Sequence, residues 1–166
     1  MKRIIVLLTA VLLALTLCAC SSTPKSDVSM FDLSRAMLSA VEFGEMSYVS
    51  SADSNAKDLF AYLSDMDYSK VEQFFLSYAK DGKGNADEIA VVQVKNKKDL
   101  DEAVKTLNAH LQKRINLYRT YDPTQSAKIE KGEVFTESGL AILIVSDNNA
   151  AVKSAFLSAL KQQTNQ

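Results

Sequence analysis

Leu140-Ala141-Ile142-Leu143-Ile144-Val145 is the most informative stretch of the chain for its architecture, because all six of its residues are apolar. Consecutive apolar residues in a strand point to both faces of a sheet, and neither face can then be left to water. We therefore predict an interior strand over residues 140–145. Leu143, near its centre, is expected to be fully buried.

The segments on either side of this strand predict a hairpin and a helix. Residues 128–136 predict an antiparallel partner strand, and Glu137-Ser138-Gly139 predicts the turn between the two strands. Residues 148–160 predict a helix that is capped by Ser146 or Asp147. The side chains that this helix is expected to bury are Val152, Phe156, Leu157 and Leu160.

The same pattern of a hairpin followed by a helix occurs earlier in the chain. Strands are predicted at residues 71–79 and 89–95, with a hairpin loop over Asp81–Asp87. The helix predicted at residues 99–118 ends before Asp122-Pro123, because the residue before a proline disfavours helical geometry. Its apolar stripe recurs at steps of three and four and consists of Leu100, Val104, Leu107, Leu111, Ile115 and Tyr118.

Two short helices are predicted before the first hairpin. One begins near Met30 and is stopped by Gly44, and the other covers residues 55–63. The predicted order is therefore α-α-β-β-α-β-β-α. Hairpins require antiparallel pairing, so the sequence predicts a two-layer α+β domain with an antiparallel sheet of about four strands and helices mainly on one face.

The N-terminus is typical of an export signal. A basic pair precedes an apolar run from Ile4 to Leu17, which is shorter than a membrane-spanning helix. The last residues of this segment resemble the bacterial lipobox, since Leu17 and Ala19 stand three and one positions before Cys20. The resemblance implies a signal peptide over residues 1–19 and lipid on Cys20, and acyl chains of this kind anchor a protein to a membrane. The alternative is an ordinary secreted protein with a chance cysteine.

The mature chain is predicted to hold one domain. The lipidated cysteine and a flexible tether occupy residues 20–27, a single globular domain occupies 28–162, and 163–166 form a disordered tail. Because Cys18 leaves with the signal and Cys20 is acylated, no thiol remains for a disulfide, a zinc site or a nucleophile.

The charge of the mature chain argues against nucleic-acid binding. Loss of Lys2 and Arg3 reduces the 19 basic residues to 17, against 20 acidic residues, which gives a net charge of −3. No basic run provides the electrostatic surface that nucleic acid requires. We therefore expect no nucleic-acid partner, and contact with the membrane only through the N-terminal lipid.

Several short motifs together resemble one known family. They are Asp87-Glu88-Ile89-Ala90-Val91-Val92, Arg114 in the long helix, Tyr121-Asp122-Pro123 and Gly139 before the apolar strand. Over about residues 30–160 the chain resembles the bacterial lipoprotein family called domain of unknown function 4358, found mainly in clostridial-type Gram-positive bacteria. It departs from the family where Asp122 stands between tyrosine and proline. The resemblance implies a fold and a location, but no activity.

Residues that could carry chemistry have structural explanations. His110 is the single histidine and has no histidine or cysteine partner, so it predicts a residue at the solvent edge rather than a metal ligand or a base. Asp99 and Glu102 have capping-box spacing at the start of the long helix. Asp81–Asp87 has a lysine where a calcium loop needs an oxygen ligand. We predict no catalytic residue, no metal and no cofactor.

A charge pair between Glu88 and Arg114 is predicted from element lengths. From Glu88 the strand advances about 23 Å before the chain turns. The helix then returns about 22 Å before it reaches Arg114. The two residues therefore arrive level, and the guanidinium is expected to take the carboxylate in bidentate fashion. The candidate structural or binding patch consists of Glu88, Arg114, Tyr118 and Tyr121.

These observations favour a lipid-anchored extracytoplasmic binding or accessory module of the cell envelope, without catalytic activity. Its partner would be an envelope protein, a peptide or a glycan. The alternative is a cell-envelope hydrolase whose carboxylates, such as Asp67 and Glu88, converge in the fold. A two-lobed solute receptor is opposed by the length of the chain, which suffices for one domain.

Overall fold

The computed structural model describes residues 28–80 and 85–165. The predicted signal peptide, the lipidation site at Cys20, the tether up to residue 27 and residues 81–84 of the first hairpin loop lie outside the described residues. Among the residues that are described, no helix is both long enough and apolar enough to cross a membrane.

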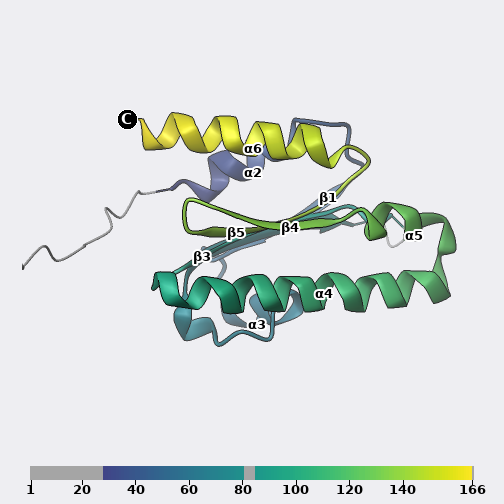
Figure 1. Cartoon of the computed structure of the whole chain (residues 1–166), viewed down its shortest axis with the longest axis horizontal. Coiled ribbons are helices and arrows are strands. Elements are labelled where there is room, and N and C mark those ends of the chain that lie inside the picture. Colours follow the sequence, from purple (N-terminus) through teal and green to yellow (C-terminus); the bar gives the residue numbers. More distant parts are fainter. Residues whose placement is uncertain (1–27, 81–84, 166) are drawn as a thin grey trace, which may run out of the picture.

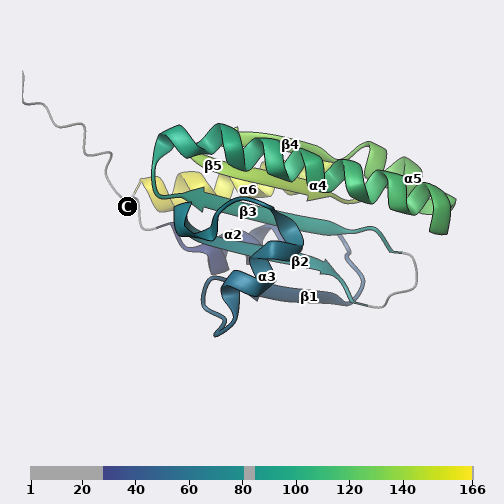
Figure 2. The same cartoon turned by 90° about the horizontal axis from the view of Figure 1, so that it is seen from below.

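The α+β class and the antiparallel sheet are confirmed, but the sheet has five strands in the order β1-β2-β3-β5-β4. All four strand pairs are antiparallel. The strands are β1 (Met46–Ser50), β2 (Val71–Ala79), β3 (Glu88–Val94), β4 (Glu133–Glu137) and β5 (Leu140–Val145). β1 was missed because Met-Ser-Tyr-Val-Ser is short and weakly apolar, as suits an edge strand (Figure 2).

The helices also differ from the prediction in two places. They are α2 (Met30–Leu38), α3 (Ala56–Leu63), α4 (Leu100–Tyr121), α5 (Pro123–Glu130) and α6 (Asn149–Thr164), with short 3-10 turns at Tyr68–Lys70 and Lys97–Asp99. α2 ends well before Gly44, so that glycine does not stop it. The predicted strand from Lys128 was wrong in its first residues, since α5 occupies them. Pro123 fits the first turn of α5, and the side chain of Asp122 accepts a hydrogen bond from the amide of Thr124.

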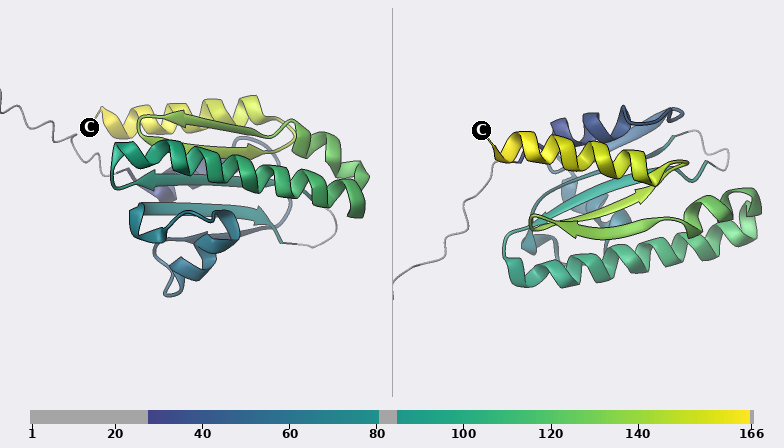
Figure 3. Two further views of the ribbon diagram at one scale, coloured as in Figure 1. Left: turned by 60° about the horizontal axis from the view of Figure 1, so that its bottom comes forward. Right: turned by 45° about the horizontal axis from the view of Figure 1, so that its top comes forward.

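The prediction of two layers was wrong, because helices cover both faces of the sheet (Figures 1 and 3). α3, α4 and α5 pack on the face that carries Phe74 and Leu143. α2 and α6 pack on the opposite face, which carries Phe75 and Ile142. Alternate residues of β5 enter the two cores, so the apolar character of both its faces is explained by two helical layers.

All but one of the core residues singled out in the last strand and the last helix are buried, as is Leu107 of α4. Leu107 of α4 and Leu143 of β5 are both 0% exposed, and every residue of β5 is buried. Val152, Phe156 and Leu160 of α6 are also buried, whereas Leu157, predicted to be buried, is 40% exposed. The prediction is thus confirmed for the central strand and for three of the four side chains of the last helix.

The ends of the described chain are held together. The Ser29 amide donates a 2.7 Å hydrogen bond to the side chain of Gln163. Next to it, the carbonyl of Val28 accepts a 2.8 Å bond from the side chain of Gln73, at the beginning of β2. α6 continues to Thr164, so residues 163 and 164 are helical rather than part of the predicted tail.

Two predicted helix caps were wrong. Asp99 makes no side-chain capping bond to α4, and Glu102 instead pairs with Lys70 at 2.6 Å. α6 is capped by Asn148, whose side chain accepts from the amide of Ala151, rather than by Ser146 or Asp147. Glu102 therefore connects the first turn of α4 to the 3-10 turn Tyr68–Lys70, which precedes β2, instead of capping the helix.

Candidate functional site

Three charged or polar side chains meet where β3 begins under the second half of α4. Glu88 is the first residue of β3 and lies between its partners Tyr78 of β2 and Val145 of β5. Because side chains alternate along a strand, Glu88 points to the same face as Ala90 and Val92, which pack on α4. His110 and Arg114 are four residues apart on α4 and so lie on one face of the helix.

The predicted pair between Glu88 and Arg114 is confirmed. Arg114 Nη1 lies 2.9 Å from Glu88 Oε2, and the two side chains are 14% and 5% exposed. The predicted bidentate contact was wrong, because Nη2 of Arg114 donates to the carbonyl of Ala86 instead, at 3.1 Å. Nη1 is buried and forms no hydrogen bond of regular geometry with the described residues.

His110 belongs to this site, although the sequence placed it at the solvent edge. Its Nε2 lies 2.7 Å from Glu88 Oε1, and its side chain is 16% exposed. A carboxylate only accepts hydrogen bonds, so Nε2 carries the proton, and the other nitrogen, Nδ1, has no partner in the described part of the chain. Each oxygen of Glu88 therefore has its own cationic or proton-donating neighbour. The spacing of His110 and Arg114 was the signal that could have linked them.

The two predicted tyrosines lie in different places. Tyr118 joins the site: its ring lies 5.4 Å from the Arg114 guanidinium carbon, and its hydroxyl donates to the carbonyl of Asn85 at 3.1 Å. Tyr121 is 81% exposed at the end of α4 and does not line the site. The predicted patch is thus Glu88, Arg114 and Tyr118 without Tyr121.

A pocket of about 330 Å³ opens beside these residues. Its size is near the lower end of the range for small-molecule sites. The lining combines these charged groups with apolar residues of β1, β2 and α3 and with the exposed tyrosines Tyr62 and Tyr78. The lining consists of Val49, Leu59, Tyr62, Leu76, Tyr78, Ala79, Asn85, Glu88, His110, Arg114 and Tyr118.

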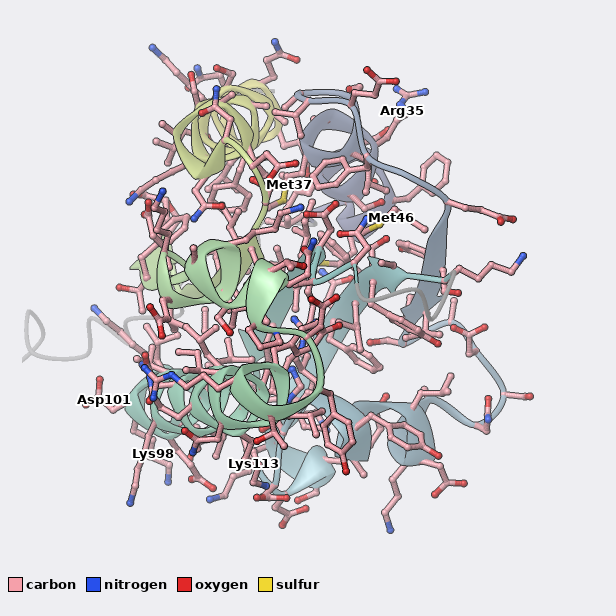
Figure 4. All side chains as sticks on the ribbon, turned by 90° about the vertical axis from the view of Figure 1, so that its right-hand side faces the viewer. Arg35, Met37, Met46, Lys98, Asp101 and Lys113 are labelled. Carbon is pink, nitrogen blue, oxygen red and sulfur yellow. The ribbon has the colours of Figure 1, made fainter. Side chains whose placement is uncertain are left out.

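The pocket lies at the end of the sheet that is opposite Val28, the first described residue. Val28 contacts Gln73 near the start of β2, whereas Tyr78 and Glu88 pair near the end of β2. Five strand residues separate Gln73 from Tyr78, a distance of about 16 Å. Figure 4 views the molecule from the end at which α4 runs into α5, with Met37 of α2 and Lys113 of α4 on opposite sides of the sheet.

Next to Glu88, a second buried charge pair holds the chain in place. Lys128 of α5 lies 2.9 Å from Asp87 and 3.1 Å from Asp147. Burial lowers the pKa of Lys128, but the hydrogen bonds and charges of Asp87 and Asp147 together outweigh it, so that its pKa is raised above the ordinary value of 10.5. The contact between Lys128 and Asp87 holds α5 against the residues that immediately precede Glu88.

Because the pKa of Lys128 is raised by folding, its ion pairs are expected to contribute stability that is fully present below pH 10.5 and is lost as pH rises through the raised pKa. Urea unfolding of the wild type and of Lys128→Met at pH 8 and at pH 11 checks this. The wild type should be the more stable at pH 8, and the difference should shrink at pH 11. If the stability difference between the wild type and Lys128→Met is the same at pH 8 and at pH 11, the charge of Lys128 is not the cause of that difference.

Other candidate groups are not brought together. Asp67 precedes β2, at the end of the sheet away from Glu88, so these two acids do not converge. Among the described residues lining the pocket, Glu88 is the single carboxylate. The described ranges contain no group of three or more histidine, cysteine or acidic side chains that could hold a metal ion.

Comparison with known proteins gave one match. A family model described as a domain of unknown function (DUF4358) matches residues 44–147, from the segment before β1 to the residue pair after β5. The match includes every pocket residue. No curated protein and no solved structure matches the chain.

Proposed function

The chain belongs to the DUF4358 family, whose description assigns no activity, and from the geometry of its site we propose that it is a binding module of the cell envelope. In this proposal Cys20 carries lipid, the domain stands at the extracytoplasmic face of the cell membrane, and the pocket between α3 and α4 receives an envelope protein, a peptide or a glycan. The module acts by binding and not by catalysis.

The observation that carries the proposal is the pocket with its buried Glu88 and the partly buried His110 and Arg114. Preformed pockets that combine apolar walls with a few converging polar groups are the usual form of ligand sites. A buried ion pair is weak as a source of stability, because desolvation offsets the attraction between the charges. A charge cluster beside an open pocket is therefore better explained by recognition than by folding alone.

The position of the pocket also suits a tethered receptor. An extended tether over residues 21–27 spans roughly 25 Å, and the domain would thus stay close to the bilayer. The tether joins the domain at Val28, at the opposite end of β2 from the pocket. The pocket would then face away from the membrane, toward the wall or the medium.

The binding proposal is tested by crosslinking in intact cells. A photoreactive amino acid at position 62, where Tyr62 is 77% exposed at the pocket, should capture a defined partner. The same amino acid at position 121, which is equally exposed but outside the pocket, should not capture it. Identical products from both positions would contradict a ligand site in the pocket, and turnover in a hydrolase panel would contradict the non-catalytic part.

Replacement of Cys20 by serine is expected to abolish membrane association, because the proposal assigns all membrane affinity to the lipid on this residue. Cell fractionation measures the effect: the wild type should sediment with membranes, and the Cys20→Ser protein should be found in the soluble or secreted fraction at comparable yield. Circular dichroism should show an unchanged fold. Recovery of Cys20→Ser with the membranes would reject the lipid anchor.

A hydrolase is the second candidate, and one contact favours it. The 2.7 Å contact between Glu88 and His110 orients the imidazole and leaves its other nitrogen as a base. A hydrolase mechanism with two converging carboxylates would need a second acidic residue, and the described pocket residues include only Glu88. If the panel shows turnover, His110→Asn should abolish it; turnover that survives this substitution would exclude His110 as the base.

A further inference from the structure

The unused hydrogen-bonding capacity of the pocket identifies a class of ligand. Both oxygens of Glu88, the single carboxylate among the described lining residues, are engaged, one by His110 and the other by Arg114. Apart from Nδ1 of His110, which accepts when Nε2 carries the proton, the pocket groups with remaining hydrogen-bonding capacity can donate. Nη1 of Arg114 is ion-paired with Glu88 Oε2 at 2.9 Å, but this contact lacks regular hydrogen-bond geometry, so its N–H groups are not fully satisfied by the described residues. A buried N–H group without a well-directed acceptor costs free energy, and a ligand oxygen in line with it would remove that cost.

The side chain of Asn85 also has a donor group without a partner among the described residues. Its side-chain oxygen accepts from the amide of Asp87 and from Lys128, which leaves its NH₂ group without a hydrogen-bond partner among the described residues. The hydroxyls of Tyr62 and Tyr78 at the pocket surface likewise have no partner in the described ranges. A ligand that supplies acceptors to Arg114, Asn85 and the tyrosine hydroxyls therefore complements this pocket.

The rest of the lining is apolar. Val49, Leu59 and Leu76 supply apolar surface to the pocket. An apolar or aromatic ligand body would be removed from water against them, which favours binding in proportion to the area covered. The tyrosine rings at the surface extend this apolar area while their hydroxyls stay in water.

We propose that the pocket binds a compact carboxylic acid with an apolar or aromatic body, whose carboxylate is received by Arg114 beside His110. Glu88 stays in place in this complex and positions both Arg114 and His110. A charged guanidinium forms stronger hydrogen bonds with a carboxylate than with a neutral carbonyl. This inference rests on the proposed binding function and adds the chemistry of the ligand to it.

The first test compares matched probes on the purified full chain in a neutral detergent, by calorimetry. N-acetylphenylalanine should bind about tenfold to a hundredfold more tightly than its primary amide, because a charge-assisted bond is lost with the amide. Glucuronate, which has a carboxylate on a polar body, should bind more weakly than N-acetylphenylalanine. Equal affinities for the acid and the amide would contradict the proposal that the pocket recognises a carboxylate. Equal affinities for the two acids would contradict the proposal that it prefers an apolar ligand body.

The second test locates the binding with variants. Glu88→Gln combined with Arg114→Gln keeps two groups that can hydrogen-bond to each other and should remove the preference for acid over amide. Arg119→Gln, which removes a surface arginine of the same helix that pairs with Glu130, should leave it unchanged. Tyr62→Ala should weaken binding and Tyr121→Ala should not.

The outcomes separate the ligand class from the function. If the acids do not bind but a partner is still captured from position 62, the ligand class is wrong and the binding function stands. If neither the probes nor a cellular partner binds, both are wrong. An acid preference that survives the Glu88→Gln, Arg114→Gln double substitution would overturn the assignment to this pocket.

Discussion

Replacement of Glu88 by alanine is expected to destabilise the protein by about 3 to 5 kcal/mol, because it leaves the Arg114 charge buried without its partner. Glu88 is 5% exposed and contacts Arg114 at 2.9 Å, and the substitution also removes the acceptor for His110 at 2.7 Å. Urea unfolding followed by circular dichroism measures the change in the free energy of unfolding.

Two further variants make this result specific. Glu130→Ala breaks the exposed ion pair with Arg119 and should cost at most about 1 kcal/mol. Glu88→Leu combined with Arg114→Met removes both charges and should recover most of the loss, since a buried pair replaced by apolar side chains is often neutral for stability. A double variant as unstable as Glu88→Ala would show that packing, and not the unpaired charge, causes the loss.

Replacement of Leu107 by alanine is expected to cost about 2 to 5 kcal/mol, because it removes apolar contacts and leaves a cavity between α4 and the sheet. Leu107 is 0% exposed in the core that also contains Leu143. Leu117→Ala provides a control on the same helix, since Leu117 is 50% exposed and should change stability by about 0.5 kcal/mol or less. Similar losses for both variants would place the buried face of α4 elsewhere.

The parts of the fold that could be predicted are those with strong periodicity. α4 carries its apolar stripe over about five turns, and β5 is continuously apolar, so both elements were found. The buried residues of β5 were all found, and so were Leu107, Leu111 and Ile115 of α4, whereas Ala103 was missed and Leu100, Val104 and Tyr118 are only partly buried. β1 and α5 were missed since neither has a strong pattern: β1 is a short edge strand with two serines, and α5 buries only Ile129. Such elements form because the sheet and α4 already provide a surface for them.

The second helical layer could have been inferred from β5 and was not. A strand that is apolar on both faces requires cover on both faces. The amphipathic α2 and α6 provide that cover, although they are separated by most of the chain and meet only after folding. Sequence periodicity identifies an apolar face, but it does not specify which face of the sheet receives it.

The candidate site was partly predictable for a geometric reason. The lengths of a strand and a returning helix are fixed by their rise per residue, which placed Glu88 level with Arg114. The individual hydrogen bonds were not predictable, because they depend on how far α4 is displaced sideways relative to β3. His110 contacts one carboxylate oxygen of Glu88, and one guanidinium nitrogen of Arg114 donates to the carbonyl of Ala86. The expected bidentate pair therefore did not form.

The hydrogen bonds between Ser29 and Gln163 have a consequence for attaching labels to this protein. They place the last turn of α6 beside the first described residues, so a fluorescent protein or a bead linked after α6 would be attached at the same end of the domain as Val28. The pocket, at the other end of β2, would stay uncovered. A C-terminal fusion is therefore the better handle for ligand-binding experiments, and an insertion near Tyr121 is the worse one.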